Sequence, residues 1–144
     1  MTLQTQKKTV SPRWIAILFF SYEVLFTGLA GILLALVLYF IFDIKSGEDF
    51  DNSKIENFWF LLFPMGLLFQ IVGLWKAANH VLKKYAIKQE NISQILYTYL
   101  TILLILLLLQ LRTQTTYSLL VFSIGIVVKT FLIRYLLKKR LAAS

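Results

Sequence analysis

Four long runs of apolar residues, separated by short polar segments, dominate the chain. The runs cover about residues 14–42, 58–75, 92–111 and 116–137. A helix needs ~20 apolar residues to cross the ~30 Å hydrocarbon layer of a bilayer, and each run is close to that length or longer. The pattern predicts an all-α, polytopic membrane protein, a bundle of four transmembrane helices that forms a single membrane domain over residues 1–144.

The ends of the first two runs carry further local signals. Ser11 followed by Pro12 predicts an N-cap and a first helical residue. The first run is far longer than the ~7–15 apolar residues of a signal peptide, and no small-residue cleavage site follows it. We therefore expect it to be a mature span. The second helix is expected to continue beyond its apolar run as a basic segment, from Lys76 to about Lys88.

Lysine and arginine are distributed unevenly among the segments that flank the runs. The two termini and the middle loop carry ten of them, against three in the first and third loops. Cytoplasmic loops of membrane proteins are enriched in these residues, so the distribution predicts that both termini and the middle loop face the cytoplasm. The first loop also contains Glu48, Asp49, Asp51 and Glu56, and the third loop contains only Arg112 as a basic residue.

Composition agrees with a membrane protein and excludes several kinds of site. The chain is 58% hydrophobic and 15% charged, whereas soluble domains are about half apolar and about a quarter charged. The absence of cysteine excludes disulfides, thiolate metal sites and cysteine nucleophiles. With His80 as the only histidine, one chain cannot form a bis-histidine haem site. No cofactor or metal is expected.

The net charge of +8 could suggest a nucleic-acid partner. The charges, however, cluster beside the apolar runs, a pattern typical of membrane orientation and of attraction to anionic lipid headgroups. We therefore expect the lipid bilayer, and no nucleic acid, as a partner. Headgroup contacts are expected for a set of residues at the cytoplasmic boundary: His80, Lys83, Lys84, Lys138, Lys139 and Arg140. The lysine and isoleucine usage suits a bacterial inner membrane.

Three of the runs contain a stripe of small and polar residues. Helices in lipid associate through close packing of small residues and through hydrogen bonds, and spacings of three or four place residues on one face. We expect these stripes to face the bundle interior or a second subunit: Glu23, Thr27, Gly31 and Ala35 with neighbouring Gly28; Gly66, Gln70, Gly73, Ala77 and His80; and Ser118, Gly125 and Lys129. The third run has no glycine or alanine, so we expect it to face lipid.

The polar residues inside the runs lie at a similar depth. At about 1.5 Å per residue, Glu23, Gln70 and Lys129 lie roughly 9–13 Å from the cytoplasmic boundary, and Thr98 and Thr101 fall in a similar band. An unpaired charge at depth costs ~2.5–3.5 kcal/mol on the translocon insertion scale. We hypothesise that Glu23 and Lys129 pair, within one chain or between subunits, with Gln70 nearby. Alternatively, Lys129 extends to the interface and Glu23 is protonated.

These features favour a non-enzymatic membrane protein that self-associates or acts as a small subunit of a membrane complex. The main alternative is an oligomeric channel, pore or ion- or proton-coupled transporter that uses the layer of Glu23 and Lys129. An enzyme is the least favoured class. Intramembrane hydrolases use a nucleophile with a base, or paired aspartates, and no run contains an aspartate or a histidine at depth.

Overall fold

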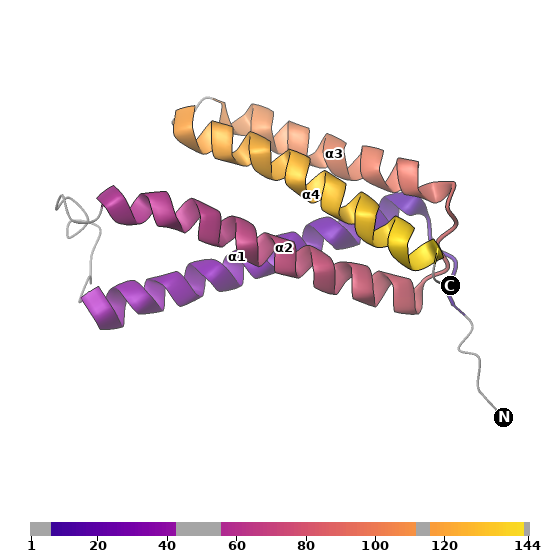
Figure 1. The fold of residues 1–144 in the computed structure, drawn as a ribbon, viewed down its shortest axis with the longest axis horizontal. Helices are drawn as coiled ribbons and strands as arrows, with labels where there is room; N and C mark the ends of the chain where they lie inside the picture. Colours follow the sequence, from indigo (N-terminus) through magenta and orange to yellow (C-terminus); the bar gives the residue numbers. More distant parts are fainter. Residues whose placement is uncertain (1–6, 43–55, 112–115, 143–144) are drawn as a thin grey trace.

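A computed structural model describes residues 7–42, 56–111 and 116–142, without the side chains of 41–42, 56–63 and Arg140. Figure 1 shows its fold. The acidic side chains of the first loop, Arg112 and the side chain of Arg140 therefore lie outside the described residues. The headgroup contact expected of Arg140 stays a prediction.

The described residues form four helices and no strand, as the all-α prediction requires. The helices are α1 (Pro12–Phe42), α2 (Glu56–Lys84), α3 (Asn91–Gln110) and α4 (Thr116–Ala142). The expected extension of the second helix is present, but α2 ends at Lys84 and not at Lys88.

The start of α1 follows its sequence signal. The helix begins at Pro12, and the backbone N–H of Trp14 points at the carbonyl oxygen of Ser11 at 3.1 Å and at its Oγ at 3.4 Å. Ser11 therefore supplies an acceptor to a backbone donor that the helix itself cannot satisfy. The predicted boundary is confirmed.

Three of the helices are long and apolar enough to cross a membrane. Among the described residues, these segments are Pro12–Phe40, Asn91–Gln110 and Thr116–Lys139. Helix α2 is not among them, and its side chains are described only from Pro64 onward. The chain is thus an all-helical protein with helices compatible with a membrane protein.

The helices run alternately up and down, so that α1 and α3 begin where α2 and α4 end (Figure 1, right). Helix α1 packs on α2 and α3, and α4 packs on the same two helices. Helices α1 and α4 therefore lie on one diagonal of the bundle, and α2 and α3 lie on the other. Toward the opposite end, the α1–α2 pair and the α3–α4 pair diverge (Figure 1).

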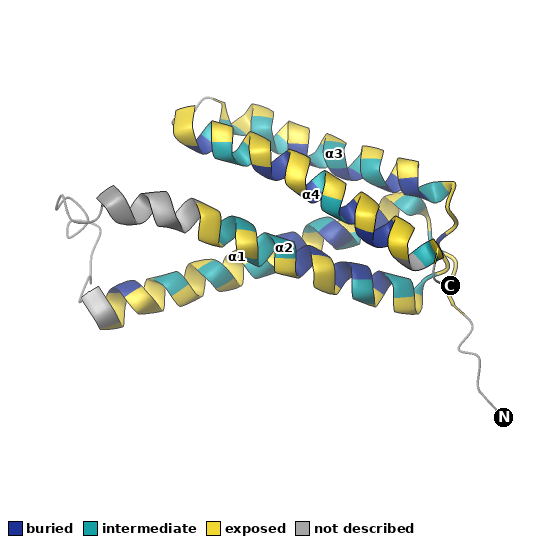
Figure 2. Ribbon diagram, in the orientation of Figure 1, coloured by how far each residue is buried: buried dark blue, intermediate teal, exposed yellow. Residues whose placement is uncertain are grey.

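The apolar core occupies the half of the bundle in which the helices converge. Figure 2 shows the buried residues concentrated there. The core includes side chains from all four helices, among them Ile15, Phe19, Leu74, Ile95 and Ile133, each at most 1% exposed. Among the residues whose burial is described, few in the diverging half are buried, so the described core lies in the converging half.

One face of α3 belongs to this core, so the expectation that the third run faces lipid is wrong for that face. The buried residues of α3 are Ile92, Ile95, Tyr99 and Leu103. Their spacings of three and four place them on one side of the helix, while Tyr97 is 74% exposed. A helix that is uniformly rich in leucine and isoleucine has no polar contrast to distinguish its packed face from its lipid face, which explains the error.

The N-terminal segment is attached to the connection between α2 and α3. The backbone N–H of Lys8 donates to the carbonyl of Lys84 at 3.1 Å, and the N–H of Ala86 donates to the carbonyl of Lys8 at 3.1 Å. This pairing brings the basic N-terminal segment beside the basic end of α2. Lys138 and Lys139, at the end of α4, lie at the same end of the bundle (Figure 1).

Two of the small residues of the stripes are packing positions within the chain. A Cβ atom on Gly73 would lie 3.0 Å from the Cβ of Phe26, and one on Gly125 would lie 3.3 Å from the Cδ1 of Leu67. Helix α2 therefore approaches α1 closely at Gly73, and α4 approaches α2 at Gly125. A larger residue at Gly73 would force the two helices apart because the contacting atoms lie close to the backbone of α1.

Ala77 and Ser118 of the stripes are buried as well, whereas four other small residues do not pack against the described part of the chain. A Cβ atom on Gly28, Gly31 or Gly66 would have no neighbour within 4 Å, and Ala35 is exposed. Small residues permit a close approach between helices but do not force one. Their faces stay open in this single chain.

We expect the Gly73→Leu substitution to destabilise the fold, because the added side chain would overlap Phe26. Overpacking of this kind costs about 1–3 kcal/mol or more, measured as the free energy of unfolding in mixed detergent micelles. Gly28→Leu is the matched control, since the same side chain would enter open space there. Equal destabilisation by both substitutions would contradict the close α1–α2 crossing.

Candidate functional site

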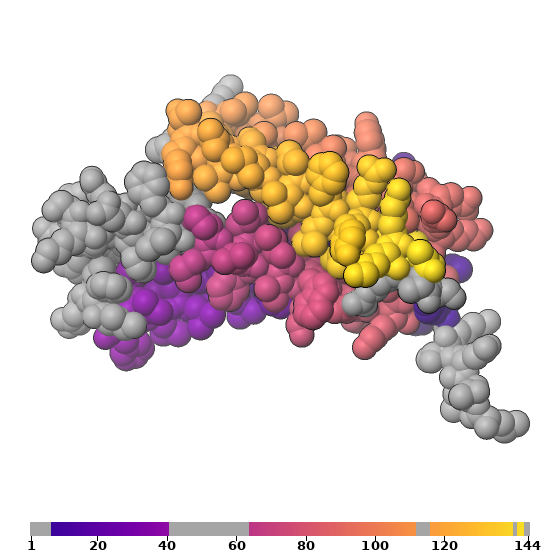
Figure 3. All heavy atoms as spheres, viewed as in Figure 1, coloured from indigo at the N-terminus to yellow at the C-terminus, as the bar shows by residue number. Residues whose placement is uncertain are grey.

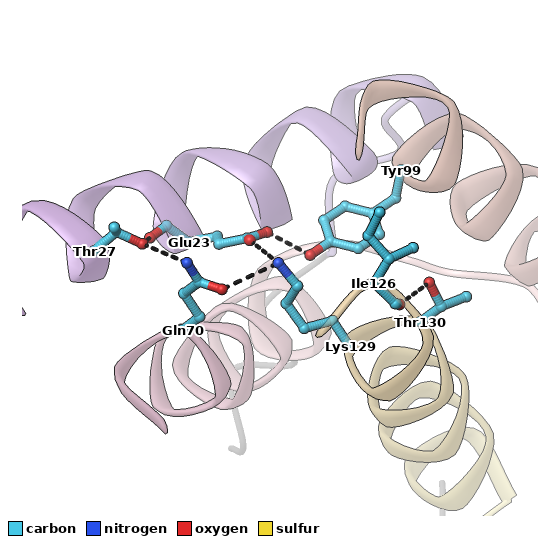
Figure 4. Close-up of polar contacts among 7 residues, drawn as sticks. All are labelled: Glu23, Thr27, Gln70, Tyr99, Ile126, Lys129 and Thr130. Carbon is cyan, nitrogen blue, oxygen red and sulfur yellow. Dashed lines mark hydrogen bonds and ion pairs between the residues drawn. The ribbon is translucent and has the colours of Figure 1, made fainter. Parts of the chain in front are cut away.

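Glu23 of α1 and Lys129 of α4 form an ion pair in the middle of the bundle (Figure 4). Glu23 is 5% exposed and Lys129 is 1% exposed. The Nζ of Lys129 donates to the Oε1 of Glu23, so the pair joins two helices across a diagonal of the bundle. The sequence left open whether Glu23 and Lys129 pair within one chain, pair between subunits or do not pair. In the structure they pair within one chain.

Tyr99 of α3 binds the second oxygen of the same carboxylate. Its hydroxyl donates to the Oε2 of Glu23, and its side chain is fully buried. Both oxygens of Glu23 therefore have a donor, one cationic and one neutral. The sequence interpretation did not include Tyr99 in the cluster. The position of Tyr99 along its helix could have predicted this contact. At about 1.5 Å per residue, Tyr99 lies roughly 10 Å along the helix from Ile92, which is close to the depth of Glu23.

Gln70 of α2 and Thr27 of α1 extend the network. The Nζ of Lys129 donates to the Oε1 of Gln70 at 3.1 Å, and the Nε2 of Gln70 donates to the Oγ1 of Thr27 at 3.1 Å. The hydroxyl of Thr27 donates in turn to the backbone carbonyl of Glu23 at 2.8 Å. These hydrogen bonds form a closed ring that starts and ends at Glu23 and includes side chains of α1, α2 and α4. Tyr99 of α3 is bonded to Glu23 outside this ring, so each of the four helices contributes at least one side chain to the polar cluster (Figure 4).

The surroundings of Lys129 also favour its charge. The Nζ lies 5.4 Å from the centroid of the Phe122 ring, within the range of a cation–π interaction. A buried ammonium needs hydrogen-bond acceptors and a nearby negative charge to offset its desolvation. Glu23, Gln70 and Phe122 together provide them, so the lysine does not need to reach the interface.

Thr98 and Thr101 do not join the cluster. The Oγ1 of Thr98 donates to the carbonyl of Gln94 at 2.9 Å, and that of Thr101 donates to the carbonyl of Tyr97 at 2.8 Å. Both hydroxyls are therefore satisfied by their own helix. Successive helix residues point about 100° apart, so the rotation that turns Tyr99 inward turns Thr101 outward. The expectation that the two threonines share the polar cluster is corrected by this rotation.

A cavity of about 290 Å³ adjoins the polar cluster between α2 and α4. Thr27, Gln70 and Lys129 line it on the side of the cluster, and Ser118 and Gln110 contribute further polar groups. Figure 3 shows the surface hollowed between these two helices. The volume has room for several water molecules, and its lining mixes the polar groups of the cluster with the apolar side chains of Leu67, Val121 and Phe122.

The residues expected to contact lipid headgroups lie exposed where α2 and α4 end. This group contains His80, Lys83, Lys84, Lys138 and Lys139. The Nζ of Lys139 donates to the hydroxyl of Tyr135 at 3.1 Å, and the ring of His80 lies 5.9 Å from that of Tyr22. Their exposure at one end is compatible with headgroup contact, which stays a prediction.

Comparison with protein families, curated proteins and solved structures finds no match to this chain. Fold and site therefore define its class: an all-helical protein in which three helices of the described part are long and apolar enough to cross a membrane. A buried polar cluster joins its four helices.

We expect the substitutions Glu23→Gln and Lys129→Met, made one at a time, each to destabilise the fold by about 3–5 kcal/mol, because each leaves the opposite charge buried without its partner. The double variant should recover much of this loss, since it leaves no unpaired charge. The free energy of unfolding in mixed micelles measures both effects, and full additivity of the two single losses would contradict the pairing.

The exposed pair Lys88–Glu90 provides a matched control. Its Nζ and Oε1 atoms lie 3.6 Å apart, with side chains 77% and 72% exposed. Surface ion pairs of this kind contribute about 0–1 kcal/mol. Lys88→Gln and Glu90→Gln should therefore leave the unfolding free energy nearly unchanged.

Proposed function

We propose that this chain is a non-enzymatic, four-span membrane protein that functions by self-association in the bilayer. In this proposal α2 is the fourth span, and both termini lie on the cytoplasmic side of a cell membrane. The length of α2 supports its role as a span. Its 29 residues reach roughly 43 Å at about 1.5 Å per residue, which exceeds the ~30 Å hydrocarbon layer. The alternating direction of the helices also supports it (Figure 1).

The orientation follows from the distribution of charge over the fold. The basic N-terminal segment, the end of α2 and the end of α4 lie together at the converging end of the bundle. Excess lysine and arginine favour the cytoplasmic side. The exposed residues Lys83, Lys84 and Lys138 would there meet the anionic headgroups of the inner leaflet.

The observation that carries self-association is an apolar crevice of about 470 Å³ between α1 and α2. Gly31, Ala30 and Gly66 form part of its lining, and a Cβ atom on either glycine would have no neighbour within 4 Å. Exposed apolar side chains alone would be uninformative, because lipid tails solvate them. A crevice lined by small residues is informative, because it lets the backbone of another helix approach closely.

A second copy of this chain is the occupant that the neighbouring surface favours. Beside the crevice, α1 presents a ridge of large side chains, Leu29, Leu36 and Phe40, which are 46%, 47% and 75% exposed. A two-fold axis would place the ridge of each copy in the crevice of the other. Because α1 forms the ridge and also one side of the crevice, a single symmetric contact would fill the crevice of each copy with the ridge of the other.

We expect Gly31→Leu with Gly66→Leu to weaken association by at least about ten-fold, a change of ~1.4 kcal/mol, because the two side chains fill the crevice. Energy transfer between donor- and acceptor-labelled copies, measured in liposomes at falling protein-to-lipid ratios, reports the dissociation constant. Gly28→Leu is the matched control, since Gly28 lies on the same helix in open space and does not line the crevice.

Two outcomes would contradict self-association. One is an unchanged dissociation constant in the crevice variant, or an equal change in the Gly28→Leu control. The other is a strict monomer that copurifies with other membrane subunits, which would support a small subunit of a membrane complex instead.

A proton- or ion-coupled transporter is the second candidate, and the cavity beside Lys129 is the observation that favours it. Intramembrane carboxylates mark proton and ion pathways, and the buried Glu23 has a hydrogen-bond partner, Lys129, that lines this cavity. Glu23 reaches that cavity through its partners Lys129 and Gln70.

If the cluster carries ions or protons, liposomes containing the native chain should show flux that the double variant Glu23→Gln/Lys129→Met abolishes. The double variant is preferable to Glu23→Gln alone, because it leaves no unpaired buried charge that would unfold the protein. A pH-sensitive dye inside the liposomes, with an imposed potential, provides the measurement. No flux with the native chain, or equal flux with both, would contradict transport.

A further inference from the structure

A second groove, of about 550 Å³, lies between α3 and α4 near the converging end of the bundle. The side of the groove formed by α3 differs in character from the side formed by α4. Ile92, Leu96 and Leu100, spaced by four residues on α3, form an apolar wall. Arg134 and Lys138, also spaced by four residues, line the side of α4. The groove therefore combines an apolar wall with two cations.

The two cations of this groove have no partner among the described residues. Arg134 and Lys138 are exposed, and neither makes a hydrogen bond or ion pair within the described part of the chain. The nearby Lys139 differs, because its Nζ donates to the hydroxyl of Tyr135. No acidic residue is part of the described lining. An anion at this position would therefore meet two positive charges and, among the described lining residues, no negative one.

Arg134 and Lys138 also border a shallow, open surface of α4 itself. This surface includes the aromatic side chains of Phe131 and Tyr135 and the ammonium of Lys139. The two cations thus have an apolar surface on either side. An anionic group with two apolar chains matches this arrangement, whereas a small free anion would use only the cations.

We propose that this groove binds an anionic phospholipid. Its phosphate lies between Arg134 and Lys138, where the guanidinium can bind the two non-bridging phosphate oxygens and the ammonium can donate to one of the same oxygens. Ser93 adds a hydroxyl beside the headgroup. One acyl chain follows Ile92, Leu96 and Leu100, and the other lies against Phe131. The inference rests on the proposed membrane location but not on association between copies, because the groove is separate from the α1–α2 crevice.

Native mass spectrometry of protein extracted from membranes with equal amounts of phosphatidylglycerol and phosphatidylcholine tests this site. The native chain should retain a phosphatidylglycerol molecule. Arg134→Gln/Lys138→Gln should lower the ratio of retained phosphatidylglycerol to phosphatidylcholine by roughly ten- to thirty-fold, as expected for two lost phosphate contacts. Arg13→Gln/Lys76→Gln is the matched control, because it removes one arginine and one lysine from exposed positions of α1 and α2 that line neither the groove nor the open surface of α4.

A third variant separates shape from charge. Ser93→Trp keeps both cations and fills the groove from an exposed position, so it should also release the lipid. An equal loss in the Arg13→Gln/Lys76→Gln control, or full retention in Ser93→Trp, would overturn the proposal and leave only general charge attraction. Displacement of the lipid by inorganic phosphate alone would likewise overturn it in favour of a free-anion site.

The energy-transfer measurement of association, repeated on Arg134→Gln/Lys138→Gln, keeps the two proposals distinguishable. Lipid loss with association intact supports the lipid site irrespective of the role of the α1–α2 crevice. Retention of the lipid by this variant overturns the lipid site and leaves self-association unaffected.

Discussion

The buried ion pair between Glu23 and Lys129 is the interaction on which the arrangement of the four helices depends. Each charge would be costly alone in an apolar interior, and pairing offsets that cost only when the geometry is good and the remaining polar atoms are bonded. Tyr99 and Gln70 complete those bonds from the other diagonal of the bundle. The pair therefore sets the relative rotation and depth of all four helices at one level.

The polar cluster separates two halves of the molecule with different packing. On one side lies the converging half, where Phe19, Leu74 and Ile133 form a close apolar core. On the other side the two helix pairs diverge, and the α1–α2 crevice and the cavity at Lys129 lie open. Stability thus comes from the converging half, while the surfaces proposed for association and for access to the cluster lie at the cluster and beyond it.

The closed network also changes the form that a transport mechanism could take. A pore that gathers copies of Glu23 around a symmetry axis would need this side chain to face outward, but both of its carboxylate oxygens are bonded inside its own chain. A pathway through the cavity between α2 and α4 would instead belong to each subunit. This is a further reason to give self-association through α1 and α2 priority over an axial pore.

The four helices, the start of α1 at Pro12, and the depth shared by Glu23, Gln70 and Lys129 were predictable from the residues alone. These features depend on local hydropathy, capping and the rise of a helix along its axis. Helix packing was needed to show that Tyr99 joins the cluster while Thr98 does not, that one face of α3 is buried, and that Gly73 packs where Gly31 stays open. These outcomes depend on the rotation of each helix against its neighbours. Leucine facing lipid and leucine facing another helix are chemically alike, so hydropathy does not encode that rotation.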